Sequence, residues 1–243
     1  MKNVCFDYPE FKNVLRNISL TISSNDQIAI VGKNGSGKST LFKILCGLYY
    51  PKRGEVLIND KPIENYSIEE YRERTSVLFQ DFLKYEGSLR ENIKLGDIRR
   101  DSSDDNINAA LNKANVDFLC QEEKYSLDRI LGNWFDNGSQ LSGGQWQKIA
   151  LARVYYKEAD IYLLDEPSSA LDATAELKIF NSFFEVSKGK IAIYITHRVK
   201  IAKNATKIIV IDEGKIVGIG NHAQLIESCS VYNELYKQEI KEY

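Results

Sequence analysis

Apolar residues recur along the chain with two different spacings, which separate segments typical of strands from segments typical of helices. Residues 14–22 alternate between apolar and polar side chains, and residues 28–31 are apolar throughout, with a polar turn at 23–26 between them. Alternation with a period of two is typical of a half-buried strand, and a short apolar run after a turn indicates a buried strand. Residues 56–60 carry a second hairpin signal. The amino-terminal part therefore predicts short antiparallel strands joined by turns.

From about residue 81 to residue 157 the strand signals give way to helical spacing. Two groups of apolar residues three and four positions apart mark helices there: Ile107, Ala110, Leu111 and Ala114, and Trp146, Ile149, Ala150 and Val154. Buried strand patterns return at 161–164 and 191–195 with a helical pattern between them, an order that predicts a parallel sheet. We therefore expect an α/β fold in which about 1–80 and 158–243 form the strand-rich part and about 81–157 form an inserted helical subdomain.

Composition and charge narrow the class of protein. At 243 residues with 43% hydrophobic side chains, the chain has enough apolar material for one large domain. The net charge of −2, from 32 basic and 34 acidic residues, gives no overall attraction to nucleic acid or anionic lipid. No apolar run approaches the roughly 18 residues of a membrane helix, and the four cysteines lack the spacing of a zinc site. Because the first residues also lack a secretory signal, we expect a cytoplasmic location.

A glycine-rich loop follows the apolar run at 28–31 and precedes a helical pattern in which Leu41, Ile44, Leu45 and Leu48 share one face. In such a loop, glycines let backbone N–H groups surround a phosphate, a lysine reaches the β- and γ-phosphate oxygens, and a serine holds Mg²⁺. The predicted nucleotide-binding residues are Gly32, Asn34, Gly35, Ser36, Gly37, Lys38, Ser39 and Thr40. A chance match is the alternative and occurs in roughly one random chain of this length in a hundred, before the strand and helix context is considered.

The residues downstream distinguish between classes of phosphate-loop protein. A GTPase needs an Asn-Lys-x-Asp motif that binds guanine, and the nearest match, at 112–115, lacks the final carboxylate. The strand pattern at 161–164 instead ends in Asp165 and Glu166, at the edge of the sheet that faces the phosphate loop. We expect Asp165 to hold Mg²⁺ through water and Glu166 to polarise the attacking water. A solvated strand edge is the alternative.

A further motif, Leu141-Ser142-Gly143-Gly144-Gln145, begins a helical pattern, and its Ser142 lies 23 residues before Asp165. With it, the chain resembles the nucleotide-binding domain of an ATP-binding cassette (ABC) transporter over essentially its whole length. The family's motifs appear in order as Tyr8, the phosphate loop, Gln80, residues 141–145, Asp165-Glu166, residues 169–172 and His197. The resemblance implies a RecA-like phosphate-loop core with an amino-terminal antiparallel β subdomain and an inserted α-helical subdomain.

The signature motif is a second anion-binding helix start. Ser142, Gly143 and Gly144, with Gln145 beside them, offer a hydroxyl and backbone N–H groups at the amino end of a helix. In the family, the signature of one subunit closes over the γ-phosphate held by the other, so the resemblance implies a head-to-tail dimer around two Mg-ATP. A glycine-rich helix cap is the alternative, but it does not explain the spacing to Asp165.

The resemblance also assigns roles to single residues. Tyr8 corresponds to the aromatic that stacks on adenine, a contact worth roughly 1 to 3 kcal/mol in base stacking elsewhere. His197 corresponds to the histidine at the γ-phosphate, and Gln80 to the glutamine that senses the metal and the attacking water. The predicted catalytic residues are thus Glu166, His197, Gln80 and Lys38, and the predicted metal ligands are Ser39, Gln80 and Asp165. Structural roles for Tyr8 and His197 are the alternatives.

Two segments resemble those of exporters. Residues 82–87 correspond to the stretch that contacts the coupling helices of the membrane domain. Residues 132–138 resemble the exporters' cross-talk loop, with Asp136 where exporters commonly carry Glu. The sequences at 131–135 and 145–148 are similar to those of bacterial peptide exporters, including lantibiotic exporters. We therefore expect a peptide as the exported substrate.

The resemblance implies an ATPase, with ATP and Mg²⁺ as cofactors, at the cytoplasmic face of the cell membrane. The expected partners are a second nucleotide-binding domain, identical or a paralogue, and the transmembrane domain of the transporter, with no nucleic acid partner. Because Met1 stands seven residues before Tyr8, we expect a domain excised from a longer protein, with a separate subunit as the variant. The alternatives are a soluble ABC ATPase without a transport function and a module that binds nucleotide without turnover. Glu166 argues against the binding module.

Overall fold

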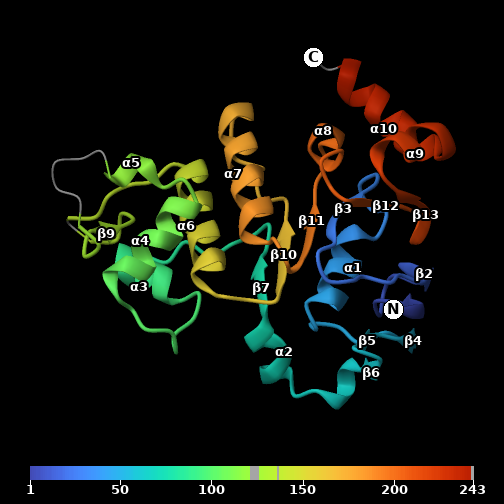
Figure 1. Cartoon of the computed structure of the whole chain (residues 1–243), viewed down its shortest axis with the longest axis horizontal. Helices are drawn as coiled ribbons and strands as arrows, with labels where there is room; N and C mark the ends of the chain where they lie inside the picture. Colours follow the sequence, from blue (N-terminus) through green and yellow to red (C-terminus); the bar gives the residue numbers. More distant parts are fainter. Residues whose placement is uncertain (121–125, 136, 242–243) are drawn as a thin grey trace.

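The computed structural model describes residues 1–120, 126–135 and 137–241. Its centre is a six-stranded sheet with the order β13-β12-β3-β11-β10-β7 (Figure 1). The strands are β3 (Gln27–Val31), β7 (Thr75–Leu78), β10 (Ile161–Asp165), β11 (Ile191–Ile195), β12 (Lys207–Asp212) and β13 (Lys215–Gly220). Neighbouring strands are parallel except for the hairpin of β12 and β13. The predicted parallel sheet is therefore confirmed.

Strands β3, β10, β11 and β12 are buried on both faces of the sheet, which explains why they read as continuous apolar runs, whereas β13 is partly exposed. The helices that cover the faces are α1 (Lys38–Leu45), α6 (Gly143–Tyr156) and α7 (Ala173–Val186). On β3, Ile28 and Ile30 share one core with residues of α1, whereas Ala29 and Val31 share another with residues of α6 and α7. The sheet thus separates the phosphate-loop helix from the helix that carries the signature motif.

The register of the sheet aligns the carboxyl ends of three strands. Asp165 at the end of β10 is opposite Ile195 on β11, and Ile195 is opposite Ile30 on β3. Glu166, His197 and the phosphate loop follow directly after these strands. They therefore emerge at one edge of the sheet, close together.

A second sheet, antiparallel and of order β2-β1-β4, shares the core of α1. The elements of this part are β1 (Lys2–Phe6), β2 (Leu15–Ile18), β4 (Arg53–Glu55), β5 (Leu57–Ile58), β6 (Lys61–Pro62), η1 (Ile63–Asn65) and α2 (Ile68–Arg74). The hairpin of β5 and β6 matches the signal at 56–60. The predicted amino-terminal β region is therefore confirmed.

The chain between β7 and β10 is mainly helical and lies to one side of the sheet (Figure 1). It contains α3 (Leu89–Lys94), α4 (Asp104–Lys113), α5 (Asp117–Cys120), α6 and two short strands that pair with each other, β8 (Gly87–Ser88) and β9 (Ile130–Leu131). The carboxyl-terminal helices are α8 (Val199–Ala202), α9 (His222–Ser228) and α10 (Ser230–Lys241). No helix in the described part of the chain has the length and apolar composition needed to cross a membrane.

One detail of the predicted helices is wrong. Helix α1 ends at Leu45, so Leu48 does not extend its apolar face and is 44% exposed. Gly47 adopts the left-handed conformation (φ 69°), and the N–H of Leu48 donates to the carbonyl oxygen of Lys43 (3.0 Å). This glycine-based cap stops the helix one turn earlier than the apolar spacing indicates. The α/β fold class is confirmed, whereas the subdomain boundaries stay a prediction.

Candidate active site

The phosphate loop connects β3 to α1 and depends on its glycines. Gly35 and Gly37 have φ values of 75° and 107°, which side chains rarely allow. A Cβ atom at Gly32 would lie 2.1 Å from the carbonyl oxygen of Ile211. The backbone conformation of the loop therefore requires glycine at these positions.

Lys38 is the first residue of α1, directly after this loop, and is buried. Its Nζ donates hydrogen bonds to the carbonyl oxygens of Gly32 (2.9 Å) and Lys33 (2.8 Å). Burial lowers the pKa of Lys38, and the carboxylates of Glu166 and Asp165 oppose this effect. The ammonium group is thus held beside the loop and the two acids.

Asp165 at the end of β10 is buried, and no described residue donates a hydrogen bond to its Oδ1. Burial, and next the charge of Glu166, raise the pKa of Asp165 to about 6. Among the described residues, no group of three or more His, Cys, Asp or Glu side chains would hold a metal. Mg²⁺ is usually bound by one or two protein oxygens together with water and phosphate. The buried carboxylate oxygen of Asp165, which has no donor among the described residues, fits that ion, and Ser39 at the start of α1 is exposed and offers a hydroxyl oxygen.

Glu166 brings three of the predicted catalytic residues together. Its Oε1 lies 2.6 Å from Nε2 of His197, and its Oε2 accepts a hydrogen bond from Nε2 of Gln80 (3.4 Å). The Glu166 backbone has a φ of 49°, and its N–H donates to the carbonyl oxygen of Ile195 (3.1 Å). A left-handed residue other than glycine costs of order 1 kcal/mol or more and is common at functional sites. The carboxylate therefore stands in a fixed position between two loops.

Tyr8 also lies against the phosphate loop. Its hydroxyl is 3.3 Å from Oγ1 of Thr40, and its ring meets those of Phe6 and Tyr49 edge to face, with centroids 5.0 and 5.6 Å away. The cavity between Tyr8 and the loop has a volume of about 300 Å³ and is also lined by Phe11, Val14, Gly35, Gly37, Lys38, Ser39 and Thr40. An aromatic side chain, apolar groups and the loop thus border one hollow.

The signature residues lie elsewhere in the chain. Ser142 caps α6: its Oγ accepts from the N–H of Gln145 (3.3 Å), and its own N–H donates to Oε1 of Gln145 (2.9 Å). A Cβ atom at Gly144 would lie 2.9 Å from the carbonyl oxygen of Ala170. The signature glycines therefore pack on the loop after Glu166, and α6 lies apart from α1 (Figure 1).

Two buried polar side chains near this loop were not predicted from the sequence. Gln147 on α6 is 1% exposed and contacts the residues that follow β10. Glu176 on α7 is 3% exposed and accepts hydrogen bonds from Ser168 and Arg198. Arg198 follows His197 directly. The only sequence signal for either residue is a polar side chain at a helix position that faces the core.

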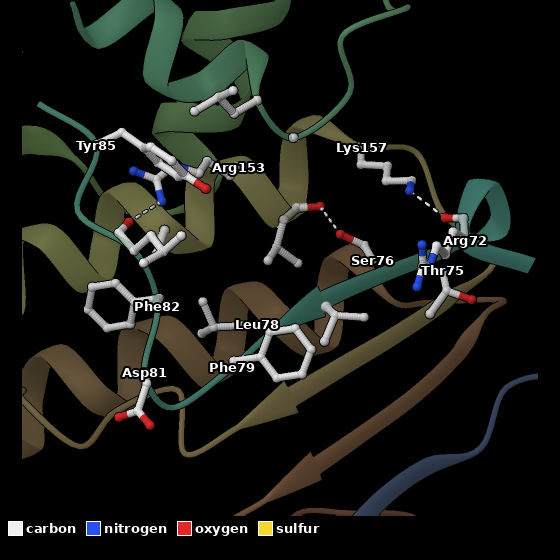
Figure 2. A pocket seen from close by; sticks show the side chains of 16 residues that line it. Arg72, Thr75, Ser76, Leu78, Phe79, Asp81, Phe82, Tyr85, Arg153 and Lys157 are labelled. Atoms are coloured by element: carbon white, nitrogen blue, oxygen red, sulfur yellow. Dashed lines mark hydrogen bonds between the residues drawn. The ribbon is translucent and has the colours of Figure 1, made fainter. Parts of the chain in front are cut away.

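A groove runs between β7, residues 79–85 and α6 (Figure 2). Its volume is about 510 Å³, and Leu83 and Tyr85 on its border are 64% and 42% exposed. Arg153 of α6 donates to the carbonyl oxygen of Leu83 (2.7 Å), and its guanidinium lies 4.8 Å from the Tyr85 ring centroid. Burial lowers the pKa of Arg153 to about 10. The segment predicted to contact a membrane domain therefore lines a groove and is anchored to the signature helix.

The predicted cross-talk loop lies near that segment. Trp134 and Phe135 are 85% and 54% exposed, and the N–H of Trp134 donates to Oε2 of Glu86 (2.5 Å). Asp136 lies outside the described residues. Two large apolar side chains are thus presented to solvent just before the signature motif.

Comparisons with known proteins show which family the chain belongs to. Residues 15–169 match the family described as ABC transporter. Over 239 residues, the chain is 47% identical to the subtilin transport ATP-binding protein SpaT of Bacillus subtilis, in an alignment that covers 98% of this chain and 39% of SpaT. It is 48% identical over 239 residues to the nisin transport ATP-binding protein NisT of Lactococcus lactis subsp. lactis, with 98% and 40% covered.

A solved structure of a bacterial Atm1-family ABC exporter with ATP bound matches 98% of this chain and 41% of its own, at 29% identity and a TM-score of 0.90. The chain thus spans about two fifths of the length of these relatives. The family resemblance and the similarity to lantibiotic transport proteins are confirmed. The chain belongs to the ABC transporter family, whose ATP-binding proteins are ATPases coupled to transport.

Proposed function

We propose that this chain hydrolyses ATP in a head-to-tail dimer with a second nucleotide-binding domain, around two Mg-ATP, and that hydrolysis powers peptide export. The dimer is supported by the observation that the residues of the predicted ATP site form two groups that lie apart in the structure of one chain. Gln80, Glu166 and His197 gather beside the phosphate loop, whereas Ser142 caps a helix on the other side of the sheet. In a two-fold dimer, each chain supplies the half that its partner lacks.

In this proposal the phosphates of ATP replace the contacts that Lys38 now makes with carbonyl oxygens of its own loop. The backbone N–H groups and the start of α1 surround the β-phosphate. Adenine stacks on Tyr8, because the hollow beside that ring opens onto the loop. The partner's signature hydroxyl and N–H groups then close over the γ-phosphate.

Asp165, Ser39 and Gln80 would hold Mg²⁺, which neutralises charge on the β- and γ-phosphate oxygens when bound. Glu166 orients the attacking water and accepts its proton at a carboxylate oxygen. Gln80 and His197 hold that carboxylate now, each on a different oxygen. His197 is 43% exposed at its side chain and is therefore also open to a bound γ-phosphate.

The groove beside α6 supports a transmembrane domain as the second partner. Leu83 and Tyr85 give it exposed apolar surface, and Arg153 links that surface to the helix that begins with the signature. A helix of the membrane domain seated there would move residues 81–157 as one subdomain. In this proposal the chain lies at the cytoplasmic face of a membrane. The nisin and subtilin proteins support a lantibiotic-type peptide as the substrate.

Mixing two inactive variants tests the shared site. Lys38→Ala removes the phosphate lysine and Ser142→Arg blocks the signature, so each dimer of one variant has two broken sites. A mixed dimer has one site with both changes and one with neither. At equal amounts half of the dimers are mixed, and the mixture is expected to recover about a quarter of the wild-type ATPase rate if the sites act independently.

The control replaces the Ser142→Arg chain by one that carries both substitutions. Its mixed dimers contain no intact site, and no activity is expected. Mixed dimers are detected by native mass spectrometry of chains with different tags. Mixed dimers that form without any ATPase above either parent would refute a site shared between chains.

A further inference from the structure

Gln147 is a buried amide that connects α6 to the loop after β10. Its Nε2 donates to the carbonyl oxygen of Glu166 (3.2 Å) and to Oγ of Ser169 (3.3 Å). Its Oε1 accepts from the N–H of Ala170 (3.1 Å). One side chain thus satisfies backbone groups at both ends of a short turn.

These contacts control a residue whose backbone is already constrained. The N–H of Glu166 is bound to Ile195 on β11, and its carbonyl oxygen accepts from the N–H of Ser169 (3.3 Å) as well as from Gln147. The φ of 49° places Glu166 in a conformation that a free chain rarely adopts. Without the amide of Gln147, the backbone carbonyl oxygen of Glu166 keeps only its hydrogen bond from Ser169. The Glu166 carboxylate then loses its fixed direction.

The same amide also braces the signature motif. Gln147 lies in the second turn of α6, and the first turn packs on the loop that Gln147 binds, as the short approach of Gly144 to Ala170 indicates. The start of α6 and residues 166–170 therefore form one unit. Because interiors are closely packed, a shift of either part displaces the other.

We propose that Gln147 is a positioning residue that couples the signature motif to Glu166 of the same chain. The inference rests on the proposed shared site, in which the signature serves the partner's nucleotide and Glu166 serves the chain's own. Gln147 then joins the two ATP sites of the dimer through a single side chain. Gln147 thus supports the signature at one ATP site and the direction of the Glu166 carboxylate at the other.

The mixed dimer described above separates the two effects. Its one intact site uses Glu166 of the Ser142→Arg chain and the signature of the Lys38→Ala chain. Gln147→Met keeps the size of the side chain and removes its hydrogen bonds. In the Ser142→Arg chain it is expected to lower kcat about tenfold with little change in KM for ATP. In the Lys38→Ala chain it is expected to raise KM for ATP severalfold.

Lys148→Met is the matched control. Lys148 is the next residue on α6, and its Nζ donates to the carbonyl oxygen of Asn115 (2.8 Å) and pairs with Asp117 (3.5 Å) rather than with residues 166–170. Lys148→Met is expected to leave kcat and KM within about twofold of the parent mixture in either chain. A purely structural role for Gln147 would lower the folded fraction and hence the rate equally in both chains. Thermal unfolding measures that fraction. If Gln147→Met does not fold, Gln147→Asn is used in its place, because it keeps an amide on a side chain that is one methylene shorter.

The outcomes distinguish the two proposals. A parent mixture without ATPase overturns the shared site and the coupling with it. An active parent mixture in which the Gln147 variant matches Lys148→Met, or changes the same parameter from either chain, overturns the coupling alone.

Discussion

Replacing Asp165 by asparagine is expected to stabilise the protein while it abolishes magnesium-dependent hydrolysis. The carboxyl group has a pKa of about 6 in the folded chain against an ordinary value of 3.8, because burial and the charge of Glu166 disfavour its ionised form. The folded chain therefore binds this proton more tightly than the unfolded chain does. Stability falls as the pH rises from 3.8 to about 6, and the full penalty applies above that window.

The size of the penalty follows from the pKa difference. At pH 7.5 ionised Asp165 costs the folded state about 3 kcal/mol, and at pH 5.0 the cost is roughly half of that, because most of the folded chains are then protonated at Asp165. Asparagine has nearly the same shape and does not ionise. Its amide stays buried, so we expect a gain of about 2 to 3 kcal/mol at pH 7.5 and about half of that at pH 5.0.

Urea unfolding of both chains, with a metal chelator and without nucleotide, measures this difference. Asp160→Asn is the control at the other end of β10, where the side chain is 65% exposed and pairs with Arg74 (3.3 Å). It is expected to change the free energy of unfolding by less than about 1 kcal/mol. An Asp165→Asn chain that is no more stable than wild type at pH 7.5, or whose advantage does not shrink at pH 5.0, would refute the reasoning.

The other predictions concern the nucleotide and the membrane partner. Glu166→Gln is expected to bind ATP and hydrolyse it about 10²- to 10⁴-fold more slowly, so that size-exclusion with Mg-ATP shows a dimer; a monomer would contradict the role of Glu166. Tyr8→Ala is expected to raise KM for ATP about tenfold and to change kcat less than about twofold, since stacking acts equally before and during reaction; a loss confined to kcat would place Tyr8 elsewhere. Leu83→Asp is expected to leave the ATPase of this chain unchanged and to reduce transport by the whole exporter. Ile98→Asp, at a side chain 78% exposed outside the groove lining, is the control, and equal losses would count against the groove.

The phosphate loop and the two acids were predictable because each is a local pattern at the end of an apolar strand. Their meeting also follows from the sequence, since parallel strands end at a common edge. Contacts of Glu166 with Gln80 and His197 needed the structure, because they join three separate loops. Their catalytic roles and those of the nucleotide and metal ligands stay predictions.

Other features left little trace in the sequence. Strands β8 and β9 have two residues each and pair across more than forty positions, so no local alternation marks them. The end of α1 depends on Gly47, whose effect on Leu48 the apolar spacing conceals. Gln147 faces the core among apolar neighbours, and periodicity counts a polar residue there as an interruption.

The aligned ends of β10, β11 and β3 limit where residues can be inserted or deleted during evolution of this protein. Deleting one residue from β11 would draw His197 back by about 3.3 Å and reverse the faces of the strand residues beyond the deletion. That distance exceeds the 2.6 Å contact between His197 and Glu166, so a single such deletion would disconnect the pair. Loops on the opposite edge of the sheet carry none of these side chains. Insertions would be tolerated there, while the strands that hold the acids keep their length.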